Sequence, residues 1–293
     1  MSTCYRFPSR SVFCGSVLAR LILASALLAP PLLVPESALA GVELRSQTTH
    51  YNQDPPRVES TLTRAHNGNL RIDISDTEAS DVRLSTISRG AFGDFLIVDH
   101  GEEAFTLLDE AAIEDLEARL QFTMLQLDKK MAELPPEQRR RMREALASQE
   151  AEPEPDLVET DRRQEIDGLD CRLFEFRRGE VLVREVWVAS WDQVAEGAEL
   201  KKSLENLQGF SQRLEQAFAS VRSEALGGAQ IFDLGDNPFK DFERFGGLPV
   251  LTVEFEGGKK SFETKVETIE ARPLTQRDFL PPESFRQRAW GSQ

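Results

Sequence analysis

The feature that most constrains this chain is a series of short segments in which apolar and polar residues alternate. In "VELRSQTTHYN", Val42 and Leu44 alternate with Glu43 and Arg45. A period of two places successive side chains on opposite faces of a β-strand. Short turn-like segments such as "HNGN", which contains the Asn-Gly hairpin signal, separate similar runs at 57–65, 70–74 and 82–84. The pattern predicts an antiparallel meander with one apolar face.

The stretch "FLIVDHGEEAFTLLDE" continues this pattern. Its two apolar runs, 95–98 and 104–108, flank a loop that contains Gly101, so they predict a hairpin. Asp99 and His100 could instead belong to a catalytic site, but no nucleophile or metal ligand stands beside them in the sequence. We therefore expect a solvated hairpin tip, because Asp and Gly favour turns.

From Asp109 onward, apolar positions recur at steps of three and four residues, the spacing of one stripe on a long helix. Pro135 and Pro136 interrupt the stripe, and Pro136 is tolerated in the first turn of a second helix. We expect a helical segment over residues 111–150, followed by a solvated linker. The stripe consists of Ile113, Leu116, Leu120, Met124, Leu127, Met131 and Leu134.

Strand-like runs return in "LDCRLFEF" and "VLVREVWVAS", with an Arg-Gly turn between them. Ser190 followed by Gln193 has the spacing of a capping box, which predicts the start of a helix. An apolar stripe extends this helix to about residue 221, although Gly197 and Gly209 weaken it.

The segment "DNPFKDFERFGG" is a short helix candidate, because Asn can cap it, Pro suits its first position and Gly-Gly ends it. Phe239, Phe242 and Phe245 recur in it at three-residue steps. We expect a short helix docked permanently on the sheet, since large apolar side chains mostly serve cores. The alternative is that the three rings plug a concavity or cover an apolar ligand in it, and Leu120 and Met124 of the long helix complete this candidate lining.

Together these patterns predict a single α+β domain over residues 41–293. Its expected fold is a curved antiparallel sheet, a half-barrel, with long helices covering the concave apolar face. The helices are expected at 111–150 and within 190–246, and a two-stranded ribbon about Gly257-Gly258 lies near the end of the chain.

Residues 1–40 have the layout of a secretory signal peptide: an Arg-containing start, the apolar core "LILASALLA" and a small-residue site. Ala38, Ala40 and Gly41 mark the expected cleavage point, after Ala40. A membrane anchor is the alternative, but the apolar run is shorter than the roughly 20 residues of a spanning helix, and Pro30-Pro31 interrupts it. We expect a periplasmic protein with no transmembrane segment after cleavage.

The chain is acidic, with a formal net charge of −15. Removing a signal peptide with three Arg and one Glu makes the charge two units more negative. Such a charge argues against nucleic acid as a partner, because nucleic-acid binding depends on cationic groups that neutralise phosphates. It also argues against adhesion to anionic lipid headgroups.

Cys171 is the single cysteine that remains after cleavage, so no internal disulfide is expected. It stands in a strand-like run, where a buried apolar thiol is typical. A disulfide-linked dimer or a reactive nucleophile are the alternatives.

Motifs for catalysis and for cofactors are mostly absent. The sequence has no G-x-S-x-G, H-E-x-x-H, P-loop or dinucleotide-binding glycine pattern. Its three histidines are scattered, and acidic pairs such as Glu114-Asp115 are expected to be a solvated face. We therefore predict no catalytic residue, no cofactor and no metal site.

A resemblance to a known family is carried by six segments: "FLIVDHGEEAFTLLDE", "EIDGLDCRLFEF", "VLVREVWVAS", "GLPVLT", "VETIEARPL" and "DFLPPESF". They resemble the hairpins and closing segments of an exported domain-of-unknown-function family, similar in fold plan to the lipoprotein carrier LolA and its relative LolB. The resemblance covers most of residues 41–285. It implies a curved antiparallel half-barrel with helices over its apolar side. LolA itself carries the acyl chains of lipoproteins between membranes.

The expected function is therefore non-enzymatic binding in the periplasm. The ligand would be apolar, an acyl chain or a lipidated protein, held between the sheet and the helices. A structural or interaction protein of the cell envelope, with a filled core, is the alternative. An enzyme with a site around His100 or Cys171 is the third possibility.

Overall fold

The computed structural model describes residues 40–76, 81–147, 154–219, 222–223, 229–230 and 242–289. The chain divides into two units, residues 1–37 and 38–293, and all described residues belong to the second. The predicted signal peptide up to residue 39, Ala38 included, lies outside the described residues. The first strand begins at Ala40 and contains Gly41.

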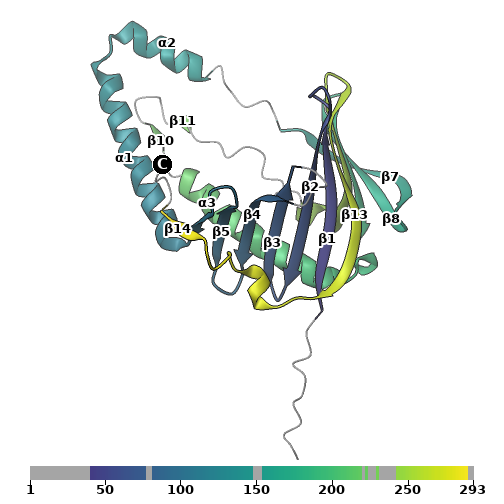
Figure 1. Cartoon of the computed structure of the whole chain (residues 1–293). Coiled ribbons are helices and arrows are strands. Elements are labelled where there is room, and N and C mark those ends of the chain that lie inside the picture. Colours follow the sequence, from purple (N-terminus) through teal and green to yellow (C-terminus); the bar gives the residue numbers. More distant parts are fainter. Residues whose placement is uncertain are drawn as a thin grey trace, which may run out of the picture. The chain divides into compact units, whose positions relative to one another are not determined.

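Twelve strands form one curved sheet, in the order β14-β6-β5-β4-β3-β2-β1-β13-β12-β9-β8-β7 (Figure 1). Neighbouring strands are antiparallel except β14 and β6, which run parallel. The sheet does not close, because β14 and β7 lie at its two ends. Its strands are β1 (Ala40–His50), β2 (Arg57–His66), β3 (Asn69–Ser75), β4 (Val82–Arg89), β5 (Asp94–Asp99), β6 (Ala104–Leu108), β7 (Asp156–Ile166), β8 (Leu169–Arg178), β9 (Val181–Ser190), β12 (Gly247–Glu256), β13 (Lys259–Pro273) and β14 (Arg286–Arg288).

Within the described ranges, helices are fewer than strands. Two short strands of two residues each, β10 (Arg222–Ser223) and β11 (Ala229–Gln230), pair with each other apart from the large sheet. None of the described helices combines the length and the apolar character needed to cross a bilayer. The helices are α1 (Glu110–Glu133), α2 (Pro136–Ala147), η1 (Trp191–Gln193), α3 (Gly197–Ala219), α4 (Phe242–Phe245) and η2 (Gln276–Phe279).

The predicted meander is confirmed, and its turns use the expected chemistry. Asn67 and Gly68 join β2 to β3 with φ angles of 51° and 75°, the left-handed pair that a tight hairpin turn requires. Asp109 caps α1, because its Oδ1 accepts a hydrogen bond from the backbone N–H of Ala112 at 2.9 Å. The change of period at Asp109 therefore marks the boundary between sheet and helix.

The predicted capping box at Ser190 is wrong. Ser190 makes no side-chain cap bond and precedes only the short helix η1, while α3 begins at Gly197. Gln193 instead donates from Nε2 to the Ser190 hydroxyl at 2.8 Å and accepts from the backbone N–H of Asp170 at 2.8 Å. Gly209 lies inside α3 without interrupting it. The serine and glutamine thus fix the β8–β9 hairpin rather than a long helix.

Helix α3 packs across one face of the sheet and supplies most of the helical part of the core. Leu200, Leu204 and Leu207 join a buried cluster with residues from β1, β2, β3, β8, β9, β12 and β13. The expectation that long helices cover this face is not confirmed, because α3 packs on it and α1 does not. Helix α1 leaves the sheet beside β6, and its first turns contact α3.

The opposite face of β5 is also covered, but by the C-terminal segment. Leu96 and Val98 alternate with Phe95 and Ile97 along this strand, so the two pairs lie on opposite faces. Phe95 and Ile97 pack toward α1 and α3. Leu96 and Val98 join a second cluster with three buried or partly buried residues of the C-terminal segment, namely Leu274, Phe279 and Phe285.

Candidate functional site

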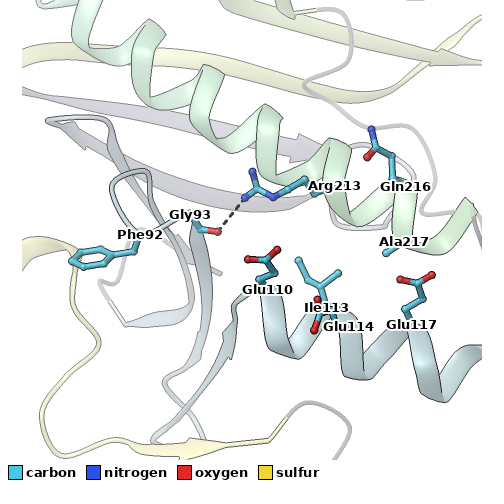
Figure 2. Close-up of a pocket in the computed structure, with 9 residues that line it drawn as sticks. All are labelled: Phe92, Gly93, Glu110, Ile113, Glu114, Glu117, Arg213, Gln216 and Ala217. Atoms are coloured by element: carbon cyan, nitrogen blue, oxygen red, sulfur yellow. Dashed lines mark hydrogen bonds between the residues drawn. The ribbon is translucent and has the colours of Figure 1, made fainter.

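A groove lies between the first turns of α1 and the C-terminal half of α3, where the β4–β5 turn meets both helices. Its volume is about 540 Å³, within the roughly 300–1,000 Å³ of small-molecule sites. Figure 2 labels its nine lining residues and shows side chains of α1 and α3 facing each other, with the turn at one end.

The floor of the groove is apolar and fixed. Ile113 of α1 and Ala217 of α3 are each 9% exposed, and both belong to a cluster with Leu108 and Phe210. The ring of Phe210 stacks on Phe95 of β5 with 5.0 Å between the ring centroids. These contacts hold the ends of both helices against the sheet edge, so the groove is built into the fold.

One wall of the groove is acidic. Glu110, Glu114 and Glu117 line it at spacings of four and three residues, which places their side chains on one face of α1. Glu110 and Glu114 are exposed and form no ion pair with any described residue. Carboxylates in the first turn favour the positive end of the helix dipole, which explains Glu110 but not the whole row.

The opposite wall carries one cation, Arg213, whose partners lie elsewhere. Its Nη2 donates to the carbonyl oxygen of Gly93 at 3.1 Å, and its guanidinium lies 5.8 Å from the centroid of Phe210. Gly93 adopts a φ of 66°, which a glycine tolerates at low cost. Arg213 therefore fastens the β4–β5 turn to α3 and forms no ion pair with Glu110 or Glu114.

The space directly beneath α3 is filled, in contrast to the cleft expected there. Leu200 is 1% exposed and Leu207 is 5% exposed, and they pack on buried strand residues such as Leu70 and Leu173. A smaller pocket of about 180 Å³ lies between the β7–β8 turn and β13, beside Ile166. The α1–α3 groove is the larger of these two cavities.

Of the residues proposed to line a ligand site, the three whose side chains are described, Phe245, Leu120 and Met124, are not among the residues that line this groove. Phe239 lies outside the described residues, as does the side chain of Phe242. Phe245 is 5% exposed and contacts the rings of Phe174 and Phe176 at centroid distances of 5.2 and 6.1 Å. The remaining two residues belong to α1, where Leu120 is partly buried and Met124 is 4% exposed.

His100 lies in the predicted hairpin turn, but it is not simply a solvated tip. Its Nε2 lies 2.7 Å from the Ser85 hydroxyl oxygen, and its ring meets Phe285 edge to face at 5.4 Å. Ser85 in turn donates to Asp73, which also accepts hydrogen bonds from Arg64 and Arg71. Burial, followed by the charge of Arg71, lowers the pKa of His100 below its usual 6.5.

This constellation contains Ser, His and Asp, but its geometry differs from that of a catalytic triad. Because Ser85 gives its single proton to Asp73, the imidazole of His100 must donate from Nε2 to the serine oxygen. A general base needs the opposite tautomer, with Nε2 free to accept the serine proton. Ser85 is also completely buried, so a substrate cannot reach it in this conformation. We interpret the network as structural.

Cys171 is fully buried, as its strand position predicts. Its thiol donates to the carbonyl oxygen of Leu169 at 3.3 Å, and burial raises its pKa. A raised pKa keeps the sulfur as a thiol, which is a poor nucleophile. Within the described part of the chain, no cluster of three or more His, Cys, Asp or Glu could hold a metal ion.

The groove was missed by reasoning from the sequence, although a signal for it was present. Glu110, Glu114 and Glu117 share one face of a helix that the period already predicted. What the sequence could not show is that Arg213 and Ala217, from a distant part of the chain, lie opposite them.

No family model and no curated protein sequence matches this chain. Among solved structures, an uncharacterized conserved protein from Thermus thermophilus aligns with 8% identity and a TM-score of 0.40, over 86% of this chain and 94% of that one. PNGF-II aligns with 10% identity and a TM-score of 0.36, over 86% of this chain and 31% of that one. A LolA superfamily protein from Nitrosomonas europaea aligns with 9% identity and a TM-score of 0.27, over 82% of this chain and 89% of that one. Likenesses of this size assign the chain to no family.

Proposed function

We propose that this protein is an exported, non-enzymatic binding protein and that the α1–α3 groove holds an amphipathic ligand. The ligand would carry an apolar chain, such as an acyl chain, beside a cationic group. Its apolar part packs on Ile113 and Ala217, and its cation faces Glu110 and Glu114. Export rests on the signal-like residues 1–40.

The observation that carries this proposal is that an apolar floor lies beside two carboxylates, Glu110 and Glu114, that form no ion pair with a described residue. Two carboxylates without an ion pair among the described residues, at Glu110 and Glu114, stand next to apolar side chains in a groove of about 540 Å³. A cation that approaches through such a groove is attracted by the wall. An anionic headgroup would be repelled, so the charge of the ligand is the specific part of the proposal.

The direct test compares single-chain amphiphiles that share a dodecyl tail but differ in the charge of the head. Calorimetric titration below the micelle concentration should show binding of dodecyltrimethylammonium and little heat with dodecyl sulfate. The double substitution Glu110→Gln and Glu114→Gln should remove this preference. Glu256→Gln with Glu283→Gln, two exposed carboxylates elsewhere, is the matched control and should preserve it.

Native mass spectrometry of protein purified from its own host tests the same idea without a chosen probe. A co-purified amphiphile of a few hundred daltons is the expected result. Flat titrations with every amphiphile, together with no bound species in the mass spectrum, would contradict the proposed ligand site.

A second candidate function is that of an interaction protein of the cell envelope. The observation that favours it is the filled space beneath α3, where buried side chains occupy the cleft that a carrier would need. In that case the ligand groove is secondary, and an outer surface of the domain meets another protein.

A further inference from the structure

The outer face of α1 carries a second apolar stripe, separate from the one that packs into the fold. Ala118, Phe122 and Leu125 follow one another at spacings of four and three residues, so their side chains share one face of the helix. Phe122 is 63% exposed and Leu125 is 66% exposed. The buried stripe lies on another face and includes Leu116 and Met124.

Charge along α1 is uneven beside this stripe. Its first nine residues contain four carboxylates, those of Glu110, Glu114, Asp115 and Glu117, and no Lys or Arg. Lys129 and Lys130 stand near the other end of the helix. Asp115 is paired with Arg119 at 2.8 Å, whereas Glu110 and Glu114 pair with no described residue. The exposed stripe therefore has a negative end.

The helix dipole favours a carboxylate in the first turn, such as Glu110, and single exposed apolar side chains are common. Neither accounts for Phe122 and Leu125 adjacent on one face of a helix that also presents unpaired carboxylates. This combination is complementary to an amphipathic segment that has an apolar face and basic side chains at one end.

We propose that the outer face of α1 is a docking surface for an amphipathic helical segment of another protein. The apolar face of that segment packs on Phe122 and Leu125. Its basic end meets the first turns of α1, at Glu110 and Glu114. The inference rests on the second proposed function, that of an interaction protein, and does not require a ligand in the groove.

A protein segment is favoured over a membrane surface by the sign of the charge. The acidic turns of α1 would repel an anionic bilayer, whereas most peripheral helices are attracted to such a bilayer by basic side chains. Vesicle binding is therefore the competing outcome that the experiment must separate.

The probe is a synthetic helical peptide with leucines on one face and lysines clustered at one end, labelled for fluorescence anisotropy. Binding to the full-length chain should weaken by at least about tenfold when Phe122 and Leu125 are both changed to serine, because exposed apolar anchors of this kind dominate small interfaces. The matched control changes Val158 and Val181, which are 41% and 59% exposed on strands β7 and β9. That control should bind like the unmodified chain.

The contribution of the carboxylates is tested separately, by measuring peptide binding at different ionic strengths. Glu110→Gln with Glu114→Gln should weaken binding severalfold and flatten its dependence on ionic strength, because two charge contacts are lost. A scrambled peptide of the same composition, which has no apolar face, should bind weakly to every variant. Circular dichroism should be unchanged in all of them, since each substituted side chain is exposed or partly exposed.

Three results would overturn the docking surface: equal affinity for the scrambled peptide, equal loss in the Val158 and Val181 control, or a Phe122 and Leu125 effect seen with phosphatidylcholine vesicles but not with the peptide. The two proposals fail separately. The Phe122→Ser, Leu125→Ser variant should lose the peptide but still bind dodecyltrimethylammonium in the groove. An unmodified chain that binds the amphiphile but not the peptide refutes docking. An unmodified chain that binds the peptide but not the amphiphile refutes the ligand site.

Discussion

The two faces of the sheet are covered in different ways. On one face α3 buries an apolar cluster, and polar contacts are placed at its rim, where Asn206 donates to the carbonyl of Gly68 at 2.8 Å and Glu199 accepts from the Gly68 N–H at 2.8 Å. On the other face, the segment after β13 is held by the buried side chains of Leu274 and Phe279 and by hydrogen bonds from a charged side chain. Arg71 donates to the carbonyl oxygens of Asp278 and Leu280, at 3.2 and 3.3 Å.

The two kinds of cover should make stability respond differently to pH. Apolar burial depends little on pH, so the stability contributed by the α3 face should be insensitive to it. The charged network centred on Asp73, which is 4% exposed, depends on ionisation and on every partner being present.

Removing one large apolar anchor from each face should give the largest losses. Phe279 is 1% exposed in the C-terminal cluster, and Leu200 is 1% exposed beneath α3. Phe279→Ala should lower the free energy of unfolding by about 3–5 kcal/mol and Leu200→Ala by about 2–5 kcal/mol. Urea denaturation measures both. If Phe279→Ala left the free energy of unfolding nearly unchanged, the C-terminal segment would not be part of the folded core, and the second face of the sheet would not be covered by it.

The charged network can be tested with a nearly isosteric change. Asp73→Asn leaves Arg64 and Arg71 without the carboxylate that accepts from both, at 2.7 Å each. We expect a loss of about 3 kcal/mol, because breaking a buried ion pair leaves its partners uncompensated.

The control for this change lies on α3. Ser203 is fully buried, and its hydroxyl has no hydrogen-bond partner among the described residues. Ser203→Ala should therefore be neutral or slightly stabilising in the same urea titration. Equal destabilisation by both changes would show that the two faces tolerate polar substitutions alike.

At Gly90, on the rim of the face that α3 covers, there is no space for a side chain. A Cβ built there would lie 2.2 Å from Nδ2 of Asn206 and 2.5 Å from the carbonyl oxygen of Gly68. Gly90→Ala should therefore cost about 1–3 kcal/mol by overpacking. Gly209→Ala on α3 meets no atom within 4 Å and should stabilise by about 0.5–1 kcal/mol, since alanine favours a helix interior. The midpoint temperature of thermal unfolding should fall for Gly90→Ala and rise for Gly209→Ala.

Most of the sheet could be predicted from the sequence, because alternation and turn residues act locally. The Asn67-Gly68 turn and the change of period at Asp109 are of this kind. The start of α3 could not, since the Ser190 and Gln193 side chains are used by a contact to Asp170 of the preceding strand.

The sequence also did not predict that the C-terminal segment covers the second face of the sheet. Arg71, Asp73 and Ser85 look like solvated strand residues, and only the return of residues 274–288 to this face buries them. The groove was hidden for the same reason, because Arg213 reaches Gly93 from a distant part of the chain. Local periodicity predicts elements, whereas charges and clefts depend on which elements meet.

The smallest expected effect is a pH dependence confined to the charged face. Burial and the neighbouring charge of Arg71 lower the pKa of His100, while Asp73 and Asp99 oppose this shift, and Ser85 and Phe285 supply its neutral contacts.

Because the folded-state pKa of His100 lies below the unfolded value of 6.5, the unfolded chain binds more protons as the pH falls through 6.5. Stability should therefore decrease on acidification between pH 6.5 and the lowered pKa, and no effect of this histidine is expected above that window. Urea midpoints measured across the window should fall for the unmodified chain and fall less for His100→Asn, whereas Leu200→Ala should keep the full pH dependence. A His100→Asn chain with an unchanged slope would mean that the charged face senses pH through its carboxylates instead.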